Sequence, residues 1–457
     1  MSELVRLLAL NVGILLVGVL LLLAAGLPRR RSHVPTLVGV APAAGLALVG
    51  LSATLGAMIG VDVGVASAAM LALLPLVAVG LLRRAGWRPA APPSRASGRL
   101  GRFVELVALL CLAGLSVAIV RLAAATGLDQ WDGWAIWGAK AHGLYEGGDL
   151  WSPVFTEPEY FMQHQEYPVL LPALEALSAD ALGRFDPTLI DVEAAVVVVA
   201  FGWAAWGLLR LAVPPAVAAG AALALTGSAP LAANAGANYA DAVVASFTAL
   251  GILCLFLWLT RDGAVVLVLA GLFLAAAALT KSEGLIFALA GVVTAVALAR
   301  RFGRSLTTAF ALAASVLVLP GLWAVVDRLN GPGARNLDAA AVLDPGYVAD
   351  SAERIPKAAD AMLGELVEGW PVVVLAVVAA LAATCLARLW LAGLFVALWS
   401  ALSFMALVLV YFVSTSPIDW HLGTSADRVV FSIALGAGTV APVLAALAWE
   451  TRTRSLP

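Results

Sequence analysis

Runs of about twenty apolar residues recur along the whole chain, and they constrain the fold more than any other feature. The chain is 62% hydrophobic and only 12% charged, whereas a soluble domain has about 45–50% apolar and about 25% charged residues. Folding on itself would not hide this much apolar surface from water. We therefore expect an integral membrane protein in which the long apolar runs are spanning helices.

Thirteen runs are candidate transmembrane helices, so the predicted fold class is an all-α polytopic membrane protein. They cover residues 4–27, 34–59, 62–82, 103–126, 188–209, 213–229, 240–260, 263–280, 284–299, 305–326, 370–387, 390–413 and 428–449. The first run is too long for the core of a signal peptide and lacks a basic leader, so we expect it to be retained. The three cysteines lie within apolar runs and are predicted to be packing residues.

The arginines indicate how the chain is oriented. When the basic stretch from Arg83 to Arg102 is placed in the cytoplasm, alternation along the chain gives every cytoplasmic junction at least one arginine. The arginines on that side are Arg29, Arg30, Arg31, Arg83, Arg84, Arg88, Arg95, Arg99, Arg102, Arg210, Arg261, Arg300, Arg301, Arg304, Arg388, Arg452 and Arg454. We expect a multi-pass protein of the plasma (inner) membrane, with its N-terminus outside and its C-terminus inside.

The chain divides into five parts by composition. These are a three-helix N-terminal module (1–84), a basic cytoplasmic linker (85–102), a core (103–326) whose outer loop covers 127–187, a second outer loop (327–369) and C-terminal helices (370–457). Two segments near the outer loops, 168–183 and 353–370, are partly apolar but too short or too charged to span. We expect both to be helices lying at the outer interface.

The stretch LDQWDGWAIWGAKAHGLYEGGDLW, residues 128–151, mixes aromatic and charged residues just after an apolar run. An interfacial belt of aromatic residues accounts for part of its tryptophan content. A belt does not require Asp129, Asp132 and Lys140 among the aromatics, so a functional site is the alternative interpretation. The spacing predicts an amphipathic helix, whose shared face consists of Trp134, Trp137, Ala141 and Leu144.

Three other stretches place ionisable groups at the predicted outer boundary, and each has a simpler structural interpretation. In ANAGANYADAVVASF, Asp241 is either a helix cap or a functional acid. In ALTKSEGLIFALAG, Lys281 and Glu283 either neutralise each other or provide a rigid cation for an anion. In DWHLGTSADRVVF, we expect Arg428 to open the last helix, either as an interfacial anchor or as a phosphate ligand.

Arg121 lies inside the apolar run that leads into the first outer loop. A charged side chain at that depth is expected to be paired, and Asp129 or Asp132 is within reach. Clusters of ionisable groups at membrane depth are functional-site hypotheses, so these stretches together predict a site at the outer boundary.

The order of these motifs resembles the GT-C superfamily of membrane glycosyltransferases, and within it the protein O-mannosyltransferases and the lipid A aminoarabinose transferases. The resemblance rests on WDGWAIWGAKAHGLYEGGDLW, QEYPVLLPALEAL, ANYADA and ALTKSEGL, with WHLGTSADR as a weaker match. It covers residues 103–300. The three helices before Arg83 depart from the usual pattern, in which the acidic loop follows the first span.

The resemblance implies an enzyme that moves a sugar from a polyprenyl-phosphate carrier to an acceptor hydroxyl on a glycan, lipid or protein. It assigns the catalytic base to Asp132, with Asp129 as the alternative, and matches Asp241 to the family's second catalytic aspartate. Lys281, Arg428 and Arg121 are the expected ligands of the donor phosphate. The expected substrate-binding residues are Trp131, Trp134, Lys140, Tyr167, Asn238, Tyr239, Glu283 and His421. The first loop has no clear DxD motif, so neither a metal nor another cofactor is predicted.

Two other functions remain open from the sequence. A transporter or lipid flippase would also use intramembrane charges, but inverted repeats and broken helices near the midplane would be expected, and the sequence shows no such symmetry. A non-catalytic relative acting as a scaffold or sensor would keep the fold without the chemistry. No basic patch with interleaved aromatic residues indicates nucleic-acid binding.

Overall fold

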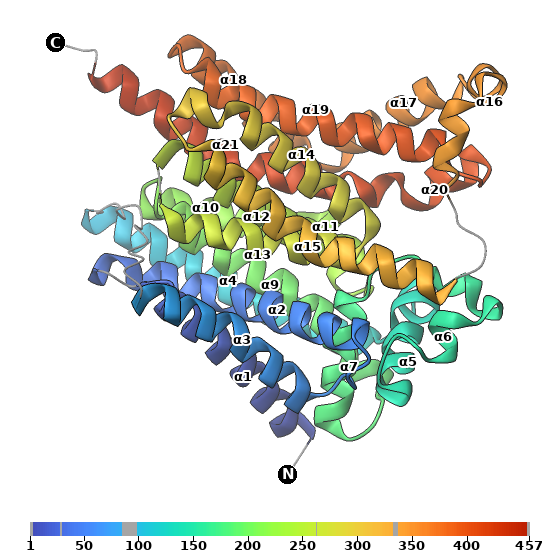
Figure 1. Cartoon of the computed structure of the whole chain (residues 1–457). Coiled ribbons are helices and arrows are strands. Elements are labelled where there is room, and N and C mark those ends of the chain that lie inside the picture. Colours follow the sequence, from blue (N-terminus) through green and yellow to red (C-terminus); the bar gives the residue numbers. More distant parts are fainter. Residues whose placement is uncertain (1–2, 28–29, 85–97, 262, 332–336, 455–457) are drawn as a thin grey trace.

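The computed structural model describes residues 3–27, 30–84, 98–261, 263–331 and 337–454 (Figure 1). Within these residues the regular structure is helical, apart from an isolated β-bridge between Leu337 and Ser414. Ten of the described helices are long and apolar enough to cross a membrane, or up to twelve spans if each of two bent pairs counts as one. The all-α, multi-pass class is therefore confirmed, whereas the number of thirteen is not. Residues 85–97 of the predicted linker lie outside the described residues.

The apolar helices follow the predicted runs closely. The long ones are α1 (Glu3–Ala24), α2 (Val34–Met58), α3 (Val65–Arg84), α4 (Arg99–Thr126), α9 (Val192–Leu209), α12 (Ala240–Arg261), α14 (Ser282–Ala299), α15 (Leu306–Asn330), α19 (Trp390–Phe412) and α21 (Phe431–Arg454). α13 (Ala264–Thr280) is apolar but shorter, with 17 residues. The bent pairs are α10 (Pro215–Thr226) with α11 (Ala229–Ala235), and α17 (Arg354–Gly369) with α18 (Pro371–Leu386). α12 is the central helix, because its apolar window is fully buried and it contacts α9, α13, α14 and α21.

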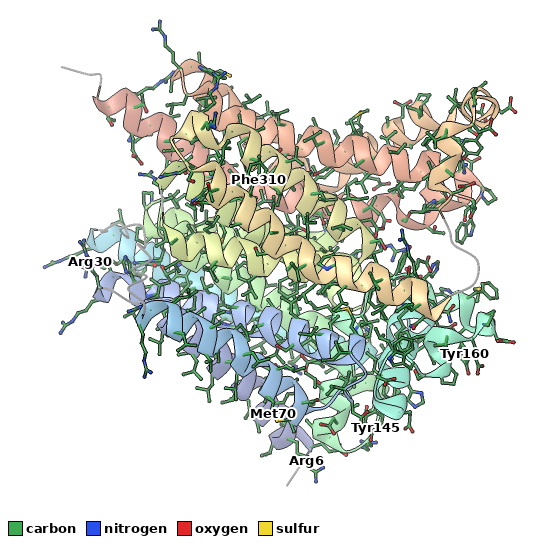
Figure 2. All side chains as sticks on the ribbon, in the orientation of Figure 1. Arg6, Arg30, Met70, Tyr145, Tyr160 and Phe310 are labelled. Atoms are coloured by element: carbon green, nitrogen blue, oxygen red, sulfur yellow. The ribbon has the colours of Figure 1, made fainter. Side chains whose placement is uncertain are left out.

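Short helices gather at one end of the bundle, which we call the loop end. They include α5 (Ala139–Gly147), α6 (Pro153–Thr156), α7 (Leu170–Leu182), α16 (Pro345–Asp350) and α20 (Ile418–Val429). Figure 1 shows α5, α6, α16 and α20 at the end opposite the C-terminus. Figure 2 shows Tyr145 and Tyr160 at the loop end and Arg30 at the other end. The described parts of the two predicted outer loops and the start of α1 thus lie toward one end, the relative arrangement that the alternation of the arginines predicts.

The two predicted interfacial helices differ in their environment. α17 is amphipathic: Met362 is buried, while Leu363 and Val367 are exposed, as expected for a helix at a membrane surface. α7, by contrast, is enclosed by α1, α2, α5 and α9, and nearly all of its residues are buried. The prediction that residues 168–183 lie on the membrane surface is therefore wrong for most of that segment, because protein rather than lipid covers its apolar faces.

The N-terminal helices pack tightly on each other and on the core. A β-carbon at Gly18 in α1 would lie 1.9 Å from the Ala41 carbonyl oxygen, and one at Gly45 in α2 would lie 2.1 Å from the Ile14 carbonyl oxygen. Only glycine permits this approach of the two backbones. α2 also contacts α7, α9 and α13, so the three-helix segment is in direct contact with the helices that carry the predicted site.

Candidate active site

Asp132 and Arg428 form an ion pair at the loop end, although 296 positions separate them in the sequence. Arg428 Nη1 donates to Asp132 Oδ2 at 2.7 Å. The Arg428 side chain is 11% exposed and the Asp132 side chain 26% exposed, so the carboxylate is the more accessible partner. Arg428 lies in the last turn of α20 rather than at the start of the last helix, which begins at Phe431. A short additional helix thus places this arginine over the end of the bundle.

Asp132 immediately precedes a π-helix, η2 (Gly133–Gly138), which continues into α5. π-Helical turns are uncommon and are frequently found at functional sites. The wider turn shifts the register of the side chains: Trp137 is 1% exposed, whereas Trp134 is 47% exposed. The prediction that Trp134 shares the buried face of Trp137, Ala141 and Leu144 is therefore wrong, because it assumed a continuous α-helix.

Arg428 also joins Asp132 to a second carboxylate. Its Nη1 lies 3.5 Å from Asp241 Oδ2, and its guanidinium carbon lies 4.2 Å from the centre of the Tyr239 ring. Its Nη2 donates to the Thr424 carbonyl oxygen. The guanidinium group is held over the tyrosine face, an arrangement to which its planar shape is suited.

Asp241, in the first turn of α12, binds Lys281 from the turn between α13 and α14. Lys281 Nζ lies 2.8 Å from Asp241 Oδ1 and 3.1 Å from Glu283 Oε1. Lys281 is the one extended residue between the two helices, and a β-carbon at Gly284 would lie 1.9 Å from the Ala277 carbonyl oxygen. The tight turn therefore holds the lysine rigidly, as predicted, and Asp241 is an ion-pair partner rather than only a helix cap.

These contacts form one continuous series of ion pairs, which we call the charge relay. Its members, in order of contact, are Asp132, Arg428, Asp241, Lys281 and Glu283. It contains three carboxylates and two cations. The four motifs that contribute to it lie far apart in the sequence, and the fold brings them together at the loop end.

Aromatic side chains surround the charge relay. The centre of the Tyr167 ring lies 5.9 Å from Lys281 Nζ and 5.7 Å from Lys140 Nζ, so the ring is near both ammonium groups. Burial raises the pKa of Tyr167, so its hydroxyl group stays protonated and can donate a hydrogen bond. Tyr411 packs against His421 with ring centres 4.6 Å apart, and His421 Nδ1 lies 2.8 Å from Ser414 Oγ. Tyr411 could not be recognised from the sequence as a neighbour of the site, because it lies within an apolar run.

Lys140 is fully buried beside the charge relay rather than within it. Its Nζ donates to the carbonyl oxygens of His164 and Tyr167 at 2.5 and 2.8 Å. Burial lowers the pKa of Lys140 to about 7, against the opposing influence of Glu166 and Asp327. These contacts connect α5 to the segment that carries Tyr167, so Lys140 helps to position the Tyr167 ring.

A pH-dependent stability follows from Lys140. Between about pH 7 and its ordinary pKa of 10.5, the unfolded protein binds more protons at this lysine than the folded protein. Stability should therefore rise with pH across this window, by up to about 1.4 kcal/mol per pH unit. Lys140→Gln, which keeps a donor but does not titrate, should lose this rise when thermal unfolding is followed from pH 7 to 9. Lys357→Gln, at an exposed lysine, is the matched control and should keep it.

Several predicted residues lie outside the charge relay. Asp129 and Arg121 are exposed, and Asp129 lies close enough to Asp191 to affect it electrostatically. The predicted pairing of Arg121 with Asp132 is not found, since Asp132 pairs with Arg428. Trp131 is exposed and packs edge-to-face on Trp134, so this pair lines the surface next to Asp132.

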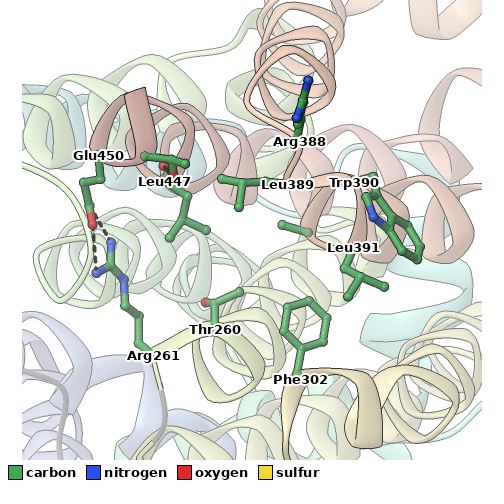
Figure 3. Close-up of a pocket in the computed structure, with 11 residues that line it drawn as sticks. Thr260, Arg261, Phe302, Arg388, Leu389, Trp390, Leu391, Leu447 and Glu450 are labelled. Atoms are coloured by element: carbon green, nitrogen blue, oxygen red, sulfur yellow. Dashed lines mark hydrogen bonds and ion pairs between the residues drawn. The ribbon is translucent and has the colours of Figure 1, made fainter. Parts of the chain in front are cut away.

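Two cavities lie away from the charge relay. One of about 390 Å³ is bordered by Thr260, Phe302, Trp390 and the Arg261–Glu450 ion pair, whose nearest atoms are 2.7 Å apart (Figure 3). The other, of about 650 Å³, lies between α1, α2, α3 and α7. In the described part of the chain, no group of three or more His, Cys, Asp or Glu side chains is placed to hold a metal ion.

Compared with models of known protein families, with curated proteins and with solved structures, the chain matches none.

Proposed function

We propose that the chain is a membrane glycosyltransferase that moves a sugar from a polyprenyl-phosphate donor to an acceptor hydroxyl at the loop end. The observation that supports this most directly is the charge relay, in which consecutive ion pairs link Asp132 to Arg428, Arg428 to Asp241 and Asp241 to Lys281. A donor with a lipid tail and a charged head must react at the boundary of the membrane. A cluster of carboxylates and cations at the end of a helical bundle fits that requirement.

Asp132 is the proposed general base. Its Oδ atoms would take the proton of the acceptor hydroxyl while that oxygen attacks the anomeric carbon. The bond between the anomeric carbon and the phosphate oxygen breaks in the same step, and its electron pair leaves with the phosphate. A single displacement inverts the anomeric centre, through a transition state with oxocarbenium character.

Arg428 and Lys281 are the proposed ligands of the leaving phosphate, whose developing charge they would stabilise. Arg428 is paired with Asp132 in the described structure, so the base and the phosphate compete for one guanidinium group. Donor binding would draw Arg428 toward the phosphate and release Asp132 for proton transfer. The exposed Trp131–Trp134 pair next to Asp132 is the proposed contact surface for the acceptor.

The proposal is tested by presenting purified protein in nanodiscs with a panel of polyprenyl-phosphate sugars and candidate acceptors. We expect free polyprenyl phosphate to appear with one donor, as measured by mass spectrometry, and empty nanodiscs to give none. A transporter or flippase would move the lipid-linked sugar without cleaving it. If no donor is cleaved and no donor raises the thermal stability of the protein, the proposal is wrong, because a bound donor stabilises the fold.

A further inference from the structure

Glu175, in the middle of α7, is a fully buried acid outside the charge relay. Its carboxyl group faces the side-chain amide of Asn238, which is also fully buried. Among the described residues, none of the four polar side-chain atoms of Glu175 and Asn238 has a partner that meets hydrogen-bond geometry. Asn238 is close enough to influence the Glu175 carboxyl group, so the two unpartnered groups are candidates to pair with each other.

Asn238 lies beside the segments that carry Asp132 and Asp241. It precedes Tyr239 and Asp241, and its φ of 50° is a left-handed conformation that asparagine adopts more readily than most residues. On its other side, a β-carbon at Gly133 would lie 3.4 Å from the Asn238 β-carbon and 2.9 Å from the Ala237 carbonyl oxygen. The turn at Asn238 thus packs directly against the π-helix that follows Asp132.

The charged groups facing Glu175 are Asp191, at the junction of α8 (Pro187–Ile190) and α9, and Glu193 in α9. Glu193 accepts hydrogen bonds from Ser178 Oγ at 2.7 Å and from Asn11 Nδ2 at 3.4 Å. Both neighbours are acidic, so within the described part of the chain no nearby cation would compensate a charge on Glu175. Burial, with smaller contributions from these two acids, raises the pKa of Glu175 well above its usual range, against the opposing influence of Asn238.

A neutral carboxylic acid is the chemical complement of a primary amide. Its hydroxyl donates to the amide oxygen while its carbonyl oxygen accepts from the amide nitrogen, so both groups are satisfied. An ionised carboxylate would leave the Asn238 oxygen without a donor and would bury an unpaired charge, which is costly.

We propose that Glu175 is a protonated carboxylic acid whose pairing with Asn238 positions Tyr239 and Asp241 against Arg428. The protonated state follows from the burial of Glu175 and from its two acidic neighbours, whatever the protein does. Its effect on turnover rests on the proposed glycosyltransferase function, and the two are tested separately. Glu175 is a positioning residue, since Asn238 and not Glu175 adjoins the charge relay.

The proton on Glu175 is tested by infrared spectroscopy of the whole protein in detergent at neutral pH. We expect wild type to show an absorption from protonated carboxylic acid that is reduced in Glu175→Gln, whose amide can still pair with Asn238. Glu159→Gln, at an exposed glutamate, is the matched control and should leave the absorption unchanged. An unchanged absorption in Glu175→Gln would overturn the proposal, whatever the activity of the protein.

The pH dependence of unfolding gives a second measurement. An acid whose pKa is raised by folding stabilises the folded state fully below its unfolded value of 4.5, and this contribution is lost as pH rises toward the folded value. The unfolding temperature of wild type should therefore fall relative to that of Glu175→Gln as pH rises above about 5. A constant difference between the two proteins would contradict a protonated Glu175.

The positioning role is tested by donor turnover. Glu175→Gln should keep kcat within about threefold of wild type, whereas Glu175→Ala, which leaves Asn238 unpaired, should lower kcat by about 10- to 100-fold with little change in KM, the size expected for a misplaced catalytic group. Equal activity of wild type and a folded Glu175→Ala would refute positioning. No turnover by wild type would instead refute the proposed function and leave the infrared result as an independent test of the protonated acid.

Discussion

Asp132→Asn is expected to lower the turnover of the polyprenyl-phosphate donor by about 10²- to 10⁴-fold, the usual contribution of a general base. Asparagine keeps the shape of the side chain and can still accept a hydrogen bond from Arg428, but it cannot take a proton. Donor binding should persist, because Asp132→Asn leaves Arg428 less tightly paired and therefore freer to bind phosphate. The measurement is release of polyprenyl phosphate over time, with donor affinity from thermal stabilisation.

Asp129→Asn is the matched control, since Asp129 lies three positions earlier, is exposed and takes no part in the charge relay. We expect it to retain activity near that of wild type. Loss of activity in Asp129→Asn with retention in Asp132→Asn would assign the base to Asp129. Retention of activity in both variants would contradict a catalytic base in this loop and would make Asp241 the next candidate for the base.

The residues of the charge relay could be predicted from the sequence because their chemistry is conspicuous in an apolar chain. Asp241, Lys281 and Arg428 each interrupt or border an apolar run, where a charge is costly unless it has a partner. The sequence does not specify which charges meet. Only the fold shows that Arg428 bridges Asp132 and Asp241, and that Arg121 and Asp129 take no part.

Other features could not be predicted, for physical reasons. Hydropathy does not distinguish an apolar helix covered by lipid from one covered by protein, so the burial of α7 was missed, and with it the role of Glu175. The exposure of Trp134 was missed because a period of 3.6 residues does not describe a π-helical turn. The short helix α20 could not be predicted, since its sequence is polar and it ends two residues before the next helix begins.

Breaking the buried part of the charge relay should have the largest effect on stability. The Lys281 and Asp241 side chains are 8% and 4% exposed, and their charged atoms are 2.8 Å apart. Lys281→Met would leave Glu283 without its cation and Asp241 with only the longer contact to Arg428. Removing one partner of a buried ion pair typically costs about 3–5 kcal/mol. We expect a loss of that size in equilibrium unfolding in mixed micelles.

Lys281→Met combined with Asp241→Asn separates the burial of charge from the loss of packing. If the cost of Lys281→Met arises from the carboxylate left behind, neutralising Asp241 should recover a large part of it, with a coupling energy of about 1–3 kcal/mol. Lys357→Met is the control, because its ion pair with Asp419 is exposed and such pairs contribute about 0–1 kcal/mol. A loss in Lys281→Met no larger than in Lys357→Met would mean that Asp241 and Glu283 are not held as buried charges. Lys281 would then be more available to a donor phosphate than its contacts indicate. The phosphate could bind Lys281 without first binding Arg428.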